Sequence, residues 1–260
     1  MTETLPQSQS DPSLLLGLGS QSAPEYTGAF DALREANAIA ETQEIFQGDR
    51  LLARAVDAPM YSRHGLDFDV IDNEINLMNT DSGIRVSTTL LIPNESIRVY
   101  KAFGFLIDSD RTDIEHVAEK DSMSSIKEGQ LRATNGNVST LPELAQWIHE
   151  THTNDMNEVN ITLPAEAVRG LFTIDAPRAK LDALVTQHHL KREGRGALPL
   201  FIYDRDKGSL EHWEPTSEEA TELLESVRVE QIRMKYAEVL PDHDFSSIAQ
   251  GAGAIAMANA

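Results

Sequence analysis

The sequence predicts an α+β fold. Many short segments are rich in Val, Leu, Ile and Thr and end near Gly, Asp or Pro, which is typical of strands followed by turns. Helical spacing of apolar residues occurs in separate segments that do not alternate regularly with these strands. The sequence has no internal repeat. This order favours α+β over a doubly wound parallel sheet.

The expected strands share short length and a high content of aliphatic and β-branched residues. They are Arg50–Val56, Ile84–Ile92, Phe103–Ile107, Glu158–Leu163, Gly170–Ile174, Leu198–Tyr203 and Leu210–Trp213. Residues 164–168 are expected to form a turn. The last two strands flank Asp204–Gly208, a polar run ending in glycine, and therefore predict a hairpin.

The expected helices have apolar residues at helical spacing, often after a capping hydroxyl or an early proline. They are residues 28–46, 141–149, 177–189 and 216 to about 239. Residues 65–80 are irregular and polar, residues 96–100 predict a short helix or bend, and residues 121–140 predict a surface loop.

Composition divides the chain into three parts. Residues 1–27 are rich in Ser, Gln and Pro and are expected to be a disordered leader. Residues 28–215 hold the expected folded domain, and residues 216–260 a C-terminal helix with a flexible tail. The N-terminus lacks the basic region and apolar stretch of a signal peptide, and no apolar run is long enough for a membrane span.

The charge balance restricts the classes of partner. The chain has 42 acidic and 22 basic residues, for a formal net charge of −20. Such a field repels nucleic acids and anionic membranes and favours a basic protein partner. A single dinucleotide remains possible, because an arginine and backbone amides can bind it locally. Cysteine is absent, so disulfides and thiolate sites are excluded and a reducing compartment is expected.

Three segments carry the candidate chemistry. They are residues 48–55 (GDRLLARA), residues 83–89 (GIRVSTT) and residues 158–170 (EVNITLPAEAVRG). They supply, in chain order, an arginine, a hydroxyl cluster and a glutamate. Such a set suits a site that binds a pyrophosphate, orients a carboxylate and stabilises a sugar cation, as cleavage of NAD at its nicotinamide–ribose bond requires.

These segments resemble the mono-ADP-ribosyltransferases of the cholera-toxin and pertussis-toxin type. That family has a first strand GD-x-L-Y-R-A, a Gly-Leu pair such as Gly65-Leu66, a strand Y-V-S-T-S, and a glutamate followed by a strand and a proline turn. The resemblance covers about residues 48–175. It implies a catalytic domain within residues 28–215, with two short, mostly antiparallel sheets around an NAD cleft and flanking helices.

The resemblance also implies roles for individual residues. Glu158 would be the catalytic acid that stabilises the oxocarbenium-like ribose, and Ser87 would donate a hydrogen bond to it. Arg54 would bind the dinucleotide, with Thr88 and Thr89 supporting the cleft. Arg50 is the alternative arginine. NAD would be the substrate and a protein, possibly a host protein, the acceptor, as for a bacterial effector or toxin secreted by a non-Sec route; otherwise the protein would be cytoplasmic.

One position departs from the family pattern. Most members carry Glu or Gln two residues before the catalytic glutamate, where this chain has Met156. Asp155 may substitute in that role, or the acceptor may be unusual. The protein may instead be an NAD glycohydrolase, or an inactive acidic interaction protein on a degenerate form of the fold. His149 and His152 lack a third metal ligand at suitable spacing, so they are expected to be surface residues and no metal is expected.

Overall fold

The computed structural model describes residues 28–62, 65–78, 85–120, 138–162, 165–196, 198–223 and 225–226. The chain divides into two compact units. The larger unit consists of Tyr26–Pro59 and Phe68–Glu214, and the smaller unit includes Met60–Asp67 and the two terminal segments. The expected leader, the loop at residues 121–137 and the chain beyond Ser226 lie outside the described residues.

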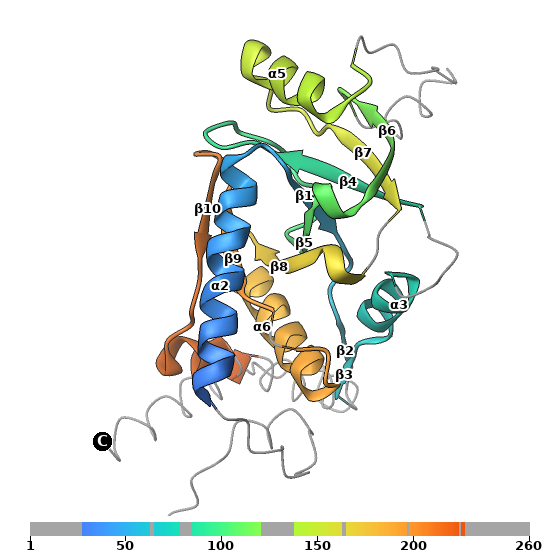
Figure 1. Cartoon of the computed structure of the whole chain (residues 1–260). Helices are drawn as coiled ribbons and strands as arrows, with labels where there is room; N and C mark the ends of the chain where they lie inside the picture. Colours follow the sequence, from blue (N-terminus) through green and yellow to red (C-terminus); the bar gives the residue numbers. More distant parts are fainter. Residues whose placement is uncertain are drawn as a thin grey trace, which may run out of the picture. The chain divides into compact units, whose positions relative to one another are not determined.

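The larger unit contains an eight-stranded sheet (Figure 1). Its strands are β1 (Leu51–Ala55), β4 (Arg85–Leu91), β5 (Phe103–Asp108), β6 (Asp113–Ala118), β7 (Glu158–Thr162), β8 (Val168–Thr173), β9 (Leu200–Asp204) and β10 (Ser209–His212). The strand order is β10-β9-β8-β5-β1-β4-β7-β6. Neighbouring strands are antiparallel except β8 and β9, which are parallel. The α+β class is therefore confirmed.

The joint between β1 and β4 differs from the two short sheets that the family resemblance implies. β1 pairs with β4 from Leu51↔Leu91 to Ala53↔Thr89, and with β5 as far as Ala55↔Gly104. Because β1 pairs with both neighbours, the strands form one hydrogen-bonded order. The β1–β4 pairing ends one residue before Arg54, so the two strands separate where that arginine lies.

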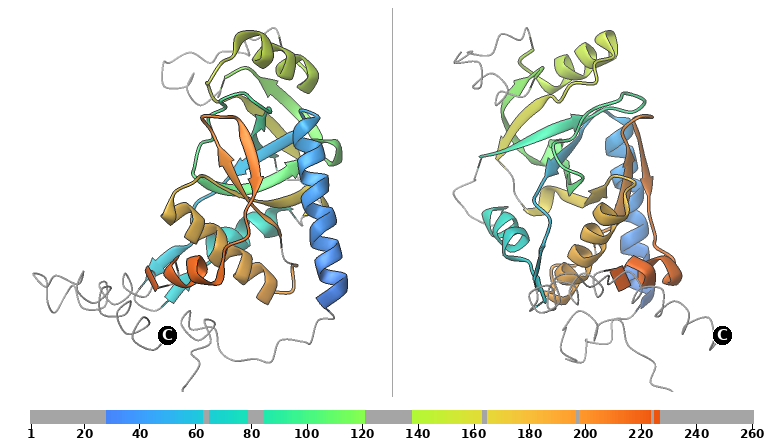
Figure 2. Two further views of the ribbon diagram at one scale, coloured as in Figure 1. Left: turned by 90° about the vertical axis from the view of Figure 1, so that its left-hand side faces the viewer. Right: turned by 180° about the vertical axis from the view of Figure 1, so that it is seen from behind.

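Helices cover the sheet of the larger unit. They are α2 (Gly28–Gln47), α3 (Asp69–Met78), α5 (Leu141–Thr151) and α6 (Pro177–Arg192), with short 3₁₀ turns η1 (Ser109–Arg111) and η2 (Ala165–Ala167). α6 packs against β5, β8 and β9, and α2 against β1, β8 and β10 (Figure 2). The strands between them supply fully buried side chains such as Leu52, Phe105 and Phe172. These contacts build the core that supports the site.

Most expected elements are confirmed, but α3 and β6 were not predicted. The expectation that residues 65–80 are irregular is wrong, because Asp69–Met78 is helical. Ile71 and Ile75 are the buried side chains of this otherwise polar helix, and Asp69 and Asp72 in its first turn favour the helix N-terminus. β6 is an edge strand with mostly exposed side chains, so it lacks a strong apolar pattern.

The start of α5 follows the predicted capping logic. Thr140 and Glu143 form a capping box, and a proline occupies the first turn. Hydrogen bonds from the backbone and hydroxyl of Ser139 lower the pKa of the Glu143 carboxyl. The helix ends at His152, which adopts a left-handed conformation with φ 47°. A short connection then leads to β7.

The smaller unit contains a hairpin of β2 (Met60–Ser62) and β3 (Gly65–Asp67). It also contains the start of the predicted C-terminal helix, where the Thr216 hydroxyl accepts a hydrogen bond from the Glu219 amide at 3.1 Å. The rest of that predicted helix lies outside the described residues. Within the described ranges, no helix combines the length and apolar character needed to cross a membrane.

Candidate functional site

The three sequence-remote segments meet at one pocket of the larger unit. The pocket has a volume of about 270 Å³. Its lining includes every residue that the sequence analysis selects for the site: Arg54, Ser87, Thr88, Thr89 and Glu158. The arginine comes from β1, the hydroxyls from β4 and the glutamate from the start of β7. The structure therefore brings the predicted set together.

The pocket exists because β1 leaves β4 after Ala53 while it remains paired with β5. Ala53 and Ala55 contribute small side chains to the lining on either side of Arg54. On the β5 side, a Cβ atom on Gly104 would lie 2.0 Å from the Arg54 carbonyl oxygen. A glycine is thus required there for β1 and β5 to approach closely.

Arg54 is held from two directions. Its Nη2 and Nε atoms donate to Glu74 Oε1 and Oε2 at 2.9 Å and 3.3 Å, and its Nη1 donates to the Ser87 carbonyl at 3.0 Å. The Arg54 and Glu74 side chains are 22% and 16% exposed. An arginine has five N–H donors, so these bonds occupy three and leave two for a ligand. Sequence analysis missed Glu74, since it lies on the unpredicted α3.

The three hydroxyl residues of β4 have different surroundings. The buried Thr88 hydroxyl donates to the Val159 carbonyl at 2.7 Å, and the buried Thr89 hydroxyl donates to the Asn157 carbonyl at 3.4 Å. Ser87 is exposed at the pocket. Alternate residues of a strand share a face, so Ser87 and Thr89 lie on the same side of β4. Thr88 and Thr89 therefore hold the segment that bears Glu158.

Asn157 continues the contact between β4 and β7 through its side chain. Its Nδ2 donates to the Leu90 carbonyl at 3.0 Å, and its Oδ1 accepts from the Leu90 amide at 2.8 Å. The last backbone pair of these strands is Thr88↔Val159, so the next step of the register places Glu158 opposite Thr89. Asn157 was not predicted as a site residue, because its role depends on this register.

Glu158 is buried, with 5% of its surface exposed, and it lines the pocket. Glu158 and Arg54 are the two charged residues of the described lining. A carboxylate in such a partly dehydrated site interacts more strongly with a developing positive charge than one in water does. The site can therefore bind an anionic group at Arg54 and stabilise a cationic centre at Glu158.

Two further lining residues differ in what sequence analysis said of them. Tyr100 was missed as a site residue; it is 70% exposed, and Lys101 Nζ lies 5.6 Å from its ring centroid. An exposed aromatic ring at a pocket offers a surface for stacking of a planar base. Met156, the departure from the family pattern, also lines the pocket. Asp155 forms an ion pair with Lys120 at 3.2 Å and is not part of the lining, so it does not occupy the place of Met156.

The remaining candidates lie elsewhere. Arg50 pairs with Asp110 and lines a second pocket, so the alternative arginine is not part of the Arg54 site. His149 and His152 are exposed, as expected, and both contact the Glu95 carboxylate, at 3.4 Å and 3.1 Å. Over the ranges that the structure describes, no group of three or more His, Asp or Glu side chains is arranged to hold a metal ion.

The chain was compared with known proteins. No model of a known protein family matches the sequence. A search of curated proteins also finds no match. The inference about function therefore rests on the residues and geometry of the pocket.

Proposed function

We propose that the protein is a mono-ADP-ribosyltransferase that cleaves NAD and transfers ADP-ribose to a protein. The observation that carries this proposal is the presence of Arg54, Ser87 and Glu158 in the lining of one pocket. Three strands far apart in the sequence contribute them. The family core of two sheets is part of the same proposal; the separation of β1 from β4 beside Arg54 supports it.

The proposed reaction breaks the bond between the nicotinamide nitrogen and the ribose carbon. Nicotinamide leaves with the bonding electrons, and the ribose passes through a transition state with oxocarbenium character. Glu158 stabilises this cation more than it stabilises the neutral ribose of the ground state, which lowers the barrier. The nucleophile of the acceptor then bonds to the ribose carbon and loses a proton.

The size of the pocket indicates which part of NAD it holds. A volume of about 270 Å³ lies just below the range of roughly 300–1,000 Å³ for pockets that enclose drug-sized ligands. The nicotinamide and its ribose are the part that this space suits. The two remaining N–H donors of Arg54 would bind a phosphate oxygen, and Tyr100 offers its ring to a base outside the pocket.

Met156 favours a second candidate, an NAD glycohydrolase. A thioether cannot take a proton from an acceptor side chain, whereas Glu or Gln at this position would engage one. Met156 lines the pocket, and Asp155 is paired with Lys120 outside it. With no group to orient a protein acceptor, water is the available nucleophile.

A third candidate is a non-enzymatic acidic interaction protein, which the contact between Arg54 and Glu74 favours. Glu74 neutralises the guanidinium that would bind the pyrophosphate. Isothermal titration calorimetry with NAD separates this candidate from the other two, because only a degenerate pocket gives no heat of binding.

The test of the proposal uses the full chain with etheno-NAD, whose fluorescence rises on cleavage, and radiolabelled NAD with a cell lysate. Cleavage with labelling of a lysate protein supports the transferase, and cleavage alone supports the glycohydrolase. Glu158→Gln should reduce cleavage by at least about 10²–10³-fold. Glu41→Gln, an exposed acid on α2, makes the same charge change and should leave cleavage unchanged. Neither cleavage nor labelling at saturating NAD would contradict both enzymatic proposals.

The biological setting is also a proposal. The Ser-rich N-terminal segment and the absence of cysteine support a bacterial effector or toxin that is secreted by a non-Sec route and acts on a host protein. Secretion of the full chain by bacteria that lack the Sec-independent machinery would contradict it.

A further inference from the structure

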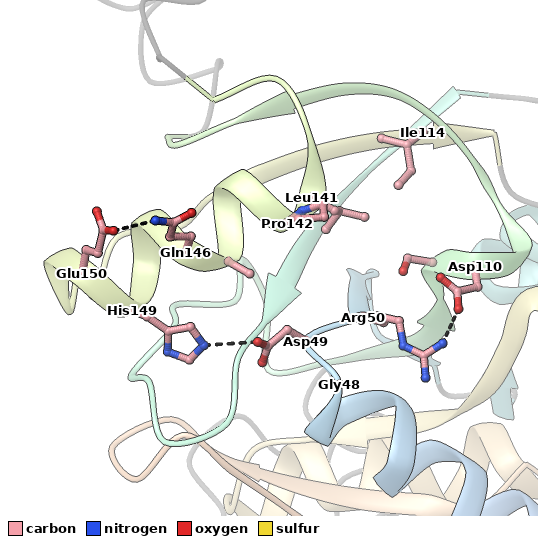
Figure 3. A pocket seen from close by; sticks show the side chains of 12 residues that line it. Gly48, Asp49, Arg50, Asp110, Ile114, Leu141, Pro142, Gln146, His149 and Glu150 are labelled. Carbon is pink, nitrogen blue, oxygen red and sulfur yellow. Dashed lines mark hydrogen bonds and ion pairs between the residues drawn. The ribbon is translucent and has the colours of Figure 1, made fainter.

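The larger unit has a second pocket, with a volume of about 700 Å³, that shares no lining residue with the first. Figure 3 shows it between α5 and the start of the β1 segment, with β6 above. One side is apolar: Ile114 of β6 and Leu141 and Pro142 of α5 line it. Ile114 is 40% exposed, so this apolar wall is open to a ligand.

The opposite side carries charged pairs (Figure 3). Asp110 pairs with Arg50, and Asp49 Oδ2 contacts His149 Nε2 at 3.2 Å. Glu150 Oε1 accepts a hydrogen bond from the Gln146 amide at 2.8 Å. The lining therefore holds three carboxylates and one permanent cation, and Arg50 is already paired. A cationic ligand gains from this balance, and an anionic ligand does not.

The walls of this pocket are held in place by contacts outside any ligand. The capping box at Thr140 and Glu143 fixes the start of α5, and the His149–Asp49 contact ties its end to the turn before β1. That turn is fixed in turn by the bond from the Arg50 amide to the Ile45 carbonyl at 3.1 Å, which closes the end of α2. A pocket with fixed walls binds at a lower entropic cost than one that must be ordered.

We propose that this pocket binds a basic segment of a partner protein. The aliphatic stem of a lysine or arginine would lie on Ile114 and Leu141, and its charged head would reach Glu150 and Asp49. Long basic side chains combine these two surfaces in one residue, which is what the two sides of the pocket require. The net charge of −20 attracts a basic protein and repels nucleic acid and anionic lipid. This inference goes beyond the proposed function and does not depend on it.

The experiment measures fluorescence anisotropy of a labelled eight-residue peptide of alternating arginine and leucine, with the full chain and without NAD. A peptide with glutamine in place of arginine, and another with glutamate, serve as comparisons. The salt concentration is about 0.15 M, where distant surface charges are screened beyond about 8 Å. The expected result is binding of the arginine peptide and much weaker binding of both comparisons.

Variants locate the binding. Glu150→Gln should weaken it about three- to fivefold, as for loss of an exposed ion pair, and Ile114→Ser roughly five- to tenfold. Glu41→Gln removes the same charge from α2 and should leave binding unchanged. The proposal is overturned if the arginine peptide does not bind, if the glutamine peptide binds equally, or if Glu41→Gln weakens binding as much as Glu150→Gln. NAD cleavage is measured separately on the same variants and should not change, so failure here is distinct from failure of the proposed function.

Discussion

Replacement of Asn157 tests how the candidate site is held together. Its side chain is buried, with 2% of its surface exposed, and makes both hydrogen bonds to the backbone of Leu90. The residue precedes Glu158 directly. We therefore expect Asn157 to act as a positioning residue that fixes the carboxylate of Glu158 in the pocket.

The expected loss of stability follows from the groups left without partners. Asn157→Ala removes both bonds to Leu90, and each buried backbone group left unsatisfied costs about 1–3 kcal/mol. Water from the adjoining pocket can satisfy part of this, so we expect a loss of about 3 kcal/mol. Asn157→Asp keeps the acceptor for the Leu90 amide and places an oxygen against the Leu90 carbonyl, so about 2 kcal/mol is expected.

Urea unfolding and NAD kinetics measure the two effects. A loss of 3 kcal/mol shifts the midpoint by about 1.5 M urea if the slope is about 2 kcal/mol per molar. For Asn157→Asp, kcat should fall about 10²-fold with little change in KM, because a displacement near 1 Å misaligns the carboxylate. Asn154→Asp, an exposed neighbour outside the pocket lining, is the matched control. The reasoning fails if Asn157→Asp and Asn154→Asp have the same kcat, or if Asn157→Ala unfolds at the wild-type midpoint.

Two further predictions concern charged contacts. Arg54→Lys should weaken NAD binding about tenfold in calorimetry, because one ammonium cannot replace a guanidinium that bridges two acceptors, whereas Glu74→Gln should tighten it; equal affinities in both variants would contradict this. The hydrogen bond to Asp49 raises the pKa of His149, so the stabilisation is present below about pH 6.5 and is lost as pH rises through the folded-state pKa. NMR titration should give a lower His149 pKa in Asp49→Asn, and an unchanged pKa would refute the assignment.

The sequence predicted the strands that carry the site because each has a clear local pattern. β1, β4 and β7 have aliphatic or β-branched residues bounded by glycine, aspartate or proline, and these patterns do not depend on distant contacts. α3 and β6 lack such a pattern. α3 buries few apolar side chains, and β6 lies at the sheet edge. Their formation depends on the tertiary structure, which local propensity does not include.

The same distinction applies to the site. Arg54 and Glu158 could be selected from residue type and local motif, since each has a recognisable chemical role. Glu74, Tyr100 and Asn157 could not, because their roles arise from contacts across the fold. Asn157 depends on the register of β7 with β4, and Glu74 on the position of an unpredicted helix beside β1.

The charges around the pocket also bear on the proposed chemistry. Glu74 balances Arg54, so Glu158 leaves the site with a net negative charge. This balance gives little attraction for a pyrophosphate in the ground state beyond the two remaining guanidinium donors. It gives strong attraction for a ribose as that ribose becomes cationic. An enzyme accelerates a reaction only through interactions that are stronger in the transition state than in the ground state. A pocket with this charge balance therefore favours the departure of nicotinamide over tight binding of intact NAD.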